Sequence, residues 1–215
     1  MSSHPHSTPH LPNVGVGQSS ARRMLSRMVR RAAQWRARQL ISSALKLADE
    51  PSLVLDLPCA ADGFWPLLHT SNSRVVIAAE TTTERLTAAL AGLAPALACR
   101  VHPLQTSLLA IDLGANAVDC IFCMHTLHLV DDPQRRLALL REFNRVTRDS
   151  VIVSVWVDGN LEAARQTALS PRNGQVQPRA QIEREFTEAG FRIGGHRDFI
   201  PGVAMLRLYV LHKRS

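Results

Sequence analysis

A long hydrophobic run, a secretory signal and a disulfide framework are all missing from this chain of 215 residues. No stretch of roughly 18 or more consecutive apolar residues occurs, so the sequence predicts no membrane span. Residues 1–20 lack the charged start and the apolar stretch of a secretory signal. The four cysteines fit buried thiols in a reducing compartment better than disulfides. We therefore expect a cytoplasmic protein with one domain and a modest extension.

The sequence also lacks the short motifs of several enzyme classes. There is no GxSxG, no P-loop, no HExxH and no catalytic-triad signature, and no metal site is predicted. Cys120 and Cys123 do form a CxxC pair, but they lie in an apolar run that is typical of a strand. Their odd spacing places the two sulfurs on opposite faces of such a strand, which favours core thiols over a metal or redox site.

Acidic residues are absent from residues 20–47, which hold eight basic side chains. The rest of the chain has 17 basic and 18 acidic residues, so the net charge of +7 is a local feature. Apolar positions in this segment recur at intervals of three and four, which predicts an amphipathic helix. Three interpretations stay open: a helix that covers the domain with a solvated basic face, a surface for an anionic membrane or nucleic acid, and a cleaved organelle-targeting peptide.

The composition divides the chain into three segments. Residues 1–19 are rich in Ser, His and Pro, contain no Lys, Arg, Asp or Glu, and are expected to form a disordered tail. Residues 20–49 are predicted to form the basic helix, and residues 50–215 alternate predicted strands and helices. Such alternation indicates an α/β fold, with a mostly parallel sheet that is covered by helices on both faces.

Seven strands and four helices are predicted in residues 50–215. The strands are expected at 52–57, 74–80, 99–104, 118–124, 150–156, 191–199 and 203–212, and the helices at 64–70, 83–92, 133–146 and 179–189. Pro201-Gly202 joins the last two strands and is too short for a helical crossover, so these strands must form an antiparallel hairpin. Residues 157–178 are polar and are predicted to be a loop.

Acidic residues end the first two predicted strands. Asp56 follows an apolar run and precedes a tight turn, and Glu80 ends the second strand. In a doubly wound sheet, an acid at the second position can accept hydrogen bonds from both hydroxyls of a ribose. The alternative role for Glu80 is an acid at the N-terminus of the next helix, and the spacing does not distinguish the two roles.

Two histidines follow the fourth predicted strand. His125 and His128 are three residues apart, so they share a face if the chain turns helical there. They are candidates for a base, a substrate contact or a weak metal pair, and the alternative is a loop pair without a chemical role. The helix predicted beyond them carries arginines that we expect to form a solvated face: Arg135, Arg136, Arg141, Arg145 and Arg148.

Five stretches of the chain follow one another in the order found in class I S-adenosylmethionine-dependent methyltransferases: Val54–Phe64, Val76–Glu80, Leu104–Ser107, Val118–Pro133 and Leu140–Arg148. The chain most resembles their small-molecule branch, the ubiquinone/menaquinone-biosynthesis type. The resemblance implies a Rossmann-like seven-stranded sheet, S-adenosylmethionine as the cofactor, and direct methyl transfer to a small-molecule acceptor. It leaves the oligomeric state open.

The resemblance also implies roles for residues of the turn at 56–63. The methionine end of the cofactor would be held there by Asp56, Pro58, Ala60, Asp62 and Gly63. The family's glycines fall at positions that are here Pro58, Ala60 and Asp62, so the glycine loop is degenerate. Proline fixes φ and removes an N–H donor, whereas the carboxylate of Asp62 could repel the cofactor's carboxylate or pair with its ammonium.

The remaining implied roles follow the strand ends. Glu80 would hold the ribose, and Ser107 and Leu108 would flank the adenine. Met124 and His125 would lie near the transferable methyl group. His128 is the candidate catalytic residue, as a proton acceptor.

Two alternatives to a small-molecule methyltransferase are carried forward. The first is a catalytically inactive methyltransferase-fold scaffold, which the degenerate glycine loop favours. The second is a nucleic-acid methyltransferase that docks through the basic helix at residues 20–47. The nearly neutral remainder of the chain counts against nucleic acid, because a groove that follows phosphates should also be basic. Peripheral contact with a membrane surface through residues 20–47 stays open.

Overall fold

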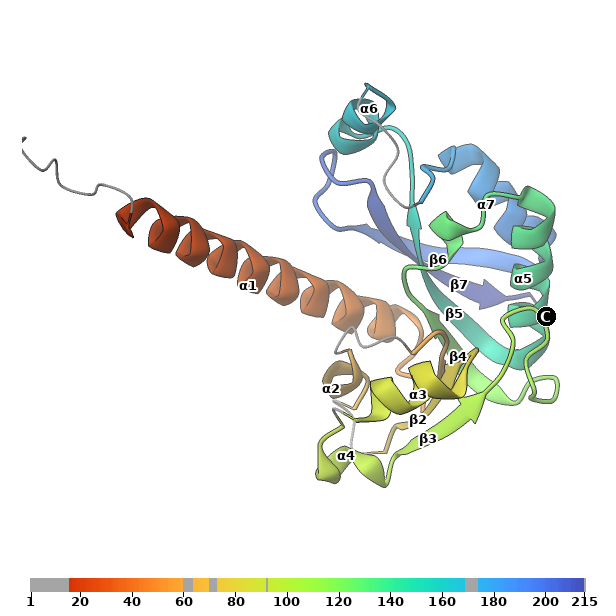
Figure 1. Cartoon of the computed structure of the whole chain (residues 1–215). Coiled ribbons are helices and arrows are strands. Elements are labelled where there is room, and N and C mark those ends of the chain that lie inside the picture. The colour runs from red at the N-terminus through yellow and green to blue at the C-terminus, as the bar shows by residue number, and fades with distance from the viewer. Residues whose placement is uncertain (1–15, 60–63, 70–72, 92, 169–173, 215) are drawn as a thin grey trace, which may run out of the picture. The chain divides into compact units, whose positions relative to one another are not determined.

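The computed structural model describes residues 16–59, 64–69, 73–91, 93–168 and 174–214, with side chains described from residue 27 onward except at 166–168 (Figure 1). The chain divides into two compact units, Met1–Arg36 and Ala37–Ser215. Helix α1 (Val16–Leu47) contributes to both units, and its residues from Ala37 onward belong to the second. No helix in the described part of the chain is long and apolar enough to cross a bilayer.

A seven-stranded sheet forms the centre of the second unit, in the order β3-β2-β1-β4-β5-β7-β6. Its strands are β1 (Leu53–Asp56), β2 (Val75–Glu80), β3 (Val101–Gln105), β4 (Val118–Cys123), β5 (Thr147–Trp156), β6 (Phe191–Asp198) and β7 (Leu206–Lys213). Strands β1 to β5 are parallel, and β7 pairs antiparallel with both β5 and β6. The predicted mostly parallel sheet with an antiparallel C-terminal hairpin is confirmed.

Helices cover both faces of the sheet, and each face has its own apolar cluster (Figure 1). On one face pack α5 (Pro133–Val146) and α7 (Arg179–Glu188). On the other pack the last turns of α1, together with α2 (Trp65–Leu68) and α3 (Thr83–Leu90). This arrangement follows from strands that are apolar on both sides, as expected for a buried parallel sheet.

The CxxC pair illustrates this two-sided burial. Cys120 belongs to the cluster beneath α1, and Cys123 belongs to the cluster beneath α5 and α7. The two sulfurs therefore lie on opposite faces, as the odd spacing predicts. Burial raises the pKa of both thiols to about 12, so they stay protonated at neutral pH and serve as core side chains.

Two short helices were not predicted. The structure contains α4 (Pro95–Ala98) before β3 and α6 (Leu161–Ala168) inside the segment 157–178, where the sequence predicts only a loop. The loop prediction is wrong at α6 because Asn160 starts a helix: its side-chain oxygen accepts a hydrogen bond from the backbone N–H of Ala163 at 2.9 Å. Such a cap satisfies one of the free N–H groups of a helix start.

The prediction of a solvated arginine face on α5 is wrong for Arg136. This side chain is fully buried, and it forms a two-pronged ion pair with Glu185 of α7, with N–O distances of 2.8 and 2.6 Å. A further N–H donates to the carbonyl oxygen of Val130 at 2.8 Å. Arg136 therefore connects α5 to α7 and to the loop before α5. The other four arginines are exposed, as predicted.

Candidate active site

The carboxyl ends of the parallel strands meet where the strand order reverses, between β1 and β4. Open α/β sheets bind ligands at this switch point. Beyond β1 the backbone is held from both sides, because Leu57 N–H donates to Phe122 O of β4 and Cys59 N–H donates to Ala79 O of β2. The chain thus reaches the start of the predicted cofactor turn in a fixed position.

Asp56 ends β1 and is 5% exposed. Its Oδ2 accepts a hydrogen bond of 2.7 Å from the indole N–H of Trp65, the first residue of α2. The bond joins the two ends of the turn that begins at Asp56. Of the residues predicted in this turn, Pro58 is half-buried, whereas Ala60, Asp62 and Gly63 lie outside the described residues.

Glu80 ends β2, and its side chain is almost completely buried. One carboxylate oxygen accepts from the backbone N–H of Thr81 at 3.1 Å and lies 3.6 Å from the guanidinium of Arg85. The N-cap of α3 is Thr82, whose hydroxyl accepts from Arg85 N–H at 3.3 Å, so the helix does not need Glu80 as its cap. A carboxylate has about four acceptor sites, which leaves Glu80 with capacity for a ligand's hydroxyl groups.

Asp56 and Glu80 both influence the thiol of Cys59. Burial, together with the negative charges of the two carboxylates, raises the pKa of this thiol to about 12. The two carboxylates therefore contribute to the same electrostatic potential, at Cys59 just beyond the end of β1. Such a region is electronegative and favours a ligand with positive charge.

The residues predicted to flank the adenine follow β3. Thr106 N–H donates to Glu80 O at 2.9 Å, which places Ser107 next to a residue that is hydrogen-bonded to Glu80. Ser107 is exposed, and its hydroxyl accepts from Leu109 N–H at 3.3 Å. Leu108 is half-buried and lines a groove of about 370 Å³ with Leu129 and other residues of the loop before α5.

The chain turns sharply after β4, at the predicted methyl-transfer position. Met124 is buried, and His125 has a left-handed backbone with φ of 56°, which is uncommon for a residue other than glycine. The hydroxyl of Ser154, a buried residue of β5, accepts a hydrogen bond from His125 N–H at 2.8 Å. Ser154 therefore holds the turn that presents the His125 ring to solvent.

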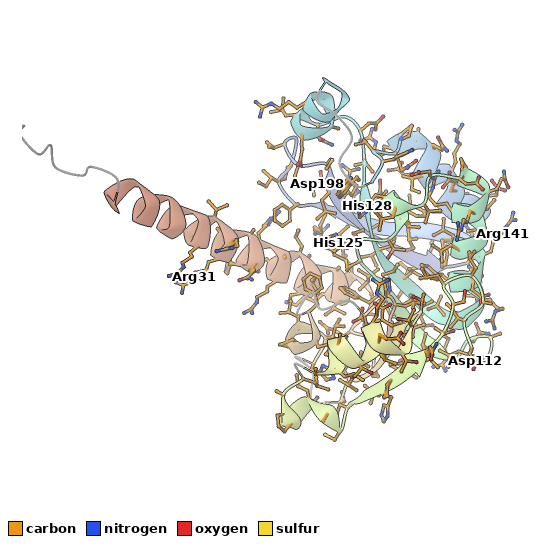
Figure 2. All side chains as sticks on the ribbon, in the orientation of Figure 1. Arg31, Asp112, His125, His128, Arg141 and Asp198 are labelled. Carbon is orange, nitrogen blue, oxygen red and sulfur yellow. The ribbon has the colours of Figure 1, made fainter. Side chains whose placement is uncertain are left out.

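His128 lies one 3₁₀ turn further on, within Leu127–Leu129, and is 4% exposed (Figure 2). Its ring stacks on the indole of Trp156, with 4.1 Å between the ring centroids, and meets the His125 ring edge to face at 6.2 Å. Burial and the neighbouring His125 lower the pKa of His128 from 6.5 to about 4. The imidazole is thus neutral at physiological pH, and its buried Nδ1 has no hydrogen-bond partner within the described structure.

Residues 174–177 run alongside the His128–Trp156 pair. Gln175 N–H donates to His128 O at 2.7 Å, and Gln177 N–H donates to Trp156 O at 2.8 Å. A Cβ atom at Gly174 would lie 2.6 Å from the His128 ring and 2.8 Å from the Trp156 ring, and φ there is 135°. Only glycine fits this close approach.

Sequence analysis missed the residues that support the predicted ones. The sequence predicts only a strand at Ser154 and Trp156, and only a loop at Gly174. The available signal was position, because Trp156 ends β5 beside the switch point and Gly174 follows a polar loop. No group of three or more His, Cys, Asp or Glu side chains that could hold a metal ion occurs among the described residues.

Residues 55–155 match the family model for the methyltransferase domain. This stretch contains β1 to β5 with the turn after each strand, and it ends beside Trp156. Over these residues, which are slightly less than half of the chain, the protein is similar to S-adenosylmethionine-dependent methyltransferases. No curated protein shows significant sequence similarity to the chain.

Solved structures share the fold of this chain at low sequence identity. Magnesium protoporphyrin IX methyltransferase from Synechocystis, solved with bound SAH, has a TM-score of 0.64 and 15% identity over 86% of this chain and 85% of its own. The S-adenosylmethionine-dependent methyltransferase SibL has a TM-score of 0.68 and 19% identity over 90% of this chain and 59% of its own. A possible exported protein of Bordetella parapertussis has a TM-score of 0.60 and 18% identity over 76% of this chain.

The lengths of these proteins differ. The chain spans 62% of the Bordetella protein and 59% of SibL, but 85% of the Synechocystis enzyme. At such identities the likeness concerns the fold alone. The function must therefore be argued from the candidate site itself.

Proposed function

We propose that this protein transfers the methyl group of S-adenosylmethionine to a small-molecule acceptor at the switch point between β1 and β4. The observation that carries the proposal is the buried Glu80 carboxylate at the end of β2, which retains acceptor capacity for a ribose. When bound, S-adenosylmethionine supplies an activated methyl group on a positively charged sulfur. The electronegative region around Asp56 and Glu80 suits a ligand with that charge.

The cofactor contacts are assigned residue by residue. Glu80 accepts hydrogen bonds from the ribose, and Ser107 and Leu108 flank the adenine beyond β3. The turn that begins at Asp56 holds the methionine end, and its other proposed members are Pro58, Ala60, Asp62 and Gly63. Charge-assisted hydrogen bonds such as those to Glu80 are roughly twice as strong as neutral ones.

Met124, His125 and His128 border the position of methyl transfer. The hydrogen bond between Ser154 and His125 fixes the turn, so positioning of the acceptor does not require rearrangement of this segment. His128 has a neutral ring with a free, buried Nδ1, which can accept a proton from the nucleophilic group of the acceptor. A metal ion has no role in this proposal.

The small-molecule class of the acceptor rests on charge. Outside residues 20–47 the chain has nearly equal numbers of acidic and basic residues, so the body offers no basic track for nucleic acid. We extend the proposal to the ubiquinone/menaquinone-biosynthesis type of acceptor, on the motif resemblance, and to a cytoplasmic location, on the reduced thiols.

Labelled S-adenosylmethionine added to cell extract together with the purified protein tests the acceptor class. We expect label in the fraction that remains soluble in acid or extracts into organic solvent. Label in acid-precipitable nucleic acid would favour the nucleic-acid alternative. Absence of transfer with intact cofactor binding would favour the catalytically inactive scaffold.

A further inference from the structure

The part of helix α1 that belongs to the first unit, Met1–Arg36, exposes large apolar side chains. Met28, Val29 and Trp35 are 61%, 60% and 62% exposed, and Ala32 between them is exposed as well. At about 100° per residue these four positions fall within an arc of roughly 120° on the helix. We call these four residues the apolar face of α1.

The opposite arc of the same segment is basic. Arg27, Arg30, Arg31 and Arg38 are all exposed, and Figure 2 shows the Arg31 side chain extending away from the helix. Arg36 lies within the apolar arc and is half-buried. The whole of α1 contains no acidic residue. This helix is therefore cationic and amphipathic at once.

The apolar face is not a continuation of the residues that α1 buries in the domain. Leu40, Ile41, Ala44 and Leu45 are buried in the core of the second unit. Steps of three or four residues beyond Trp35 lead instead to Gln39 and Ser42, which are polar and exposed. The two apolar stripes have separate helical registers, so packing on the domain does not explain the first one.

We propose that residues 27–38 of α1 bind the surface of a membrane that contains anionic lipid, lying in the interface with Met28, Val29, Ala32 and Trp35 inserted. The arginines then contact the headgroups, and tryptophan is a side chain that favours the boundary between lipid and water. This inference is independent of the proposed methyl transfer.

A second copy of α1 and nucleic acid are two other binding partners to consider for this segment, and both suit its side chains less well. A second copy of α1 paired through the apolar face would cover these side chains, but it would leave the arginines on the opposite arc without an acidic partner. Nucleic acid would satisfy the arginines through phosphate contacts but would leave the apolar face exposed to water. An anionic bilayer would bury the apolar face and would also attract the arginines. Each basic residue near such a surface adds to the attraction.

Co-sedimentation of the full-length protein with vesicles tests the proposal. Vesicles of phosphatidylcholine mixed with phosphatidylglycerol should bind the protein, whereas pure phosphatidylcholine should bind it at least about tenfold more weakly. Added salt should weaken binding because it screens the arginines. The fluorescence of the protein should shift to shorter wavelength on binding, and Trp35→Phe should remove most of that shift.

Matched variants separate this surface from general charge and from nucleic acid. The double change Arg27→Gln and Arg31→Gln should reduce vesicle binding about tenfold or more, while the same change at the exposed Arg184 and Arg192 should leave it unaltered. Alanine at Met28 and Trp35, which keeps helix propensity, should also weaken binding. Equal binding to both vesicle types, or loss with the control pair, would overturn the proposal. So would preferential binding to duplex DNA that is insensitive to the alanine changes.

Discussion

Burial of His128 makes a specific prediction about stability and pH. The folded protein lowers the pKa of His128 from 6.5 to about 4, because the buried ring cannot be hydrated when charged. Between these two values the unfolded chain binds a proton that the folded chain does not, so the free energy of unfolding falls as pH falls. The shift corresponds to a loss of about 2 kcal/mol between pH 8 and pH 5 and about 3 kcal/mol in full.

Urea denaturation of wild type and His128→Phe at pH 8 and pH 5 measures this contribution. Phenylalanine keeps a flat ring over Trp156 but does not titrate, so the variant should lose about 2 kcal/mol less than wild type on acidification. His128→Asn serves as a second variant in case the larger ring does not fit beside Gly174. An identical pH response in wild type and both variants would refute the burial of a neutral His128. His128 would then not have the buried, neutral ring on which its proposed role as a proton acceptor depends.

Three further predictions concern packing. Arg136→Met should destabilise the fold by about 3–5 kcal/mol in urea denaturation, since Glu185 is left charged and buried, and Glu185→Leu in the same chain should recover much of the loss. Gly174→Ala should lower the rate of methyl transfer by displacing the His128 and Trp156 rings, with little change in cofactor affinity, and an unaltered rate would remove this segment from the site. Removing residues 1–36 should leave a monomer in light scattering, whereas removing residues 1–44 deletes Leu40 and Ile41 from the core and should cause aggregation.

The sheet could be predicted from sequence because its strands are short apolar runs separated by polar turns. The error at Arg136 shows the limit of this approach. Arg136 has the same helical spacing as the buried Leu140 and Phe143, but its charge led to the prediction of a solvated position. Its partner is 49 residues away along the chain, and no local pattern reveals such a pairing.

In the candidate site, too, some features could be predicted from the sequence and others could not. The sequence could predict that Asp56, Glu80 and His125 lie at one edge of the sheet, because the first two end strands and His125 lies two residues beyond a third. The stacking of His128 on Trp156 and the approach of Gly174 depend on distances between segments that are remote in sequence. These contacts set the protonation state of His128, so the chemistry of the site required the structure.

Calorimetric titration of S-adenosylmethionine into wild type, Glu80→Gln and Glu84→Gln tests the central claim most directly. Glu84 is exposed on α3 and provides the same change of charge four residues away. We predict that Glu80→Gln weakens binding by about 1–3 kcal/mol, the scale for hydrogen bonds to a charged group, and that Glu84→Gln leaves it unchanged. Unaltered affinity in a folded Glu80→Gln protein, or no binding to wild type, would contradict a cofactor site at the ends of β1 and β2.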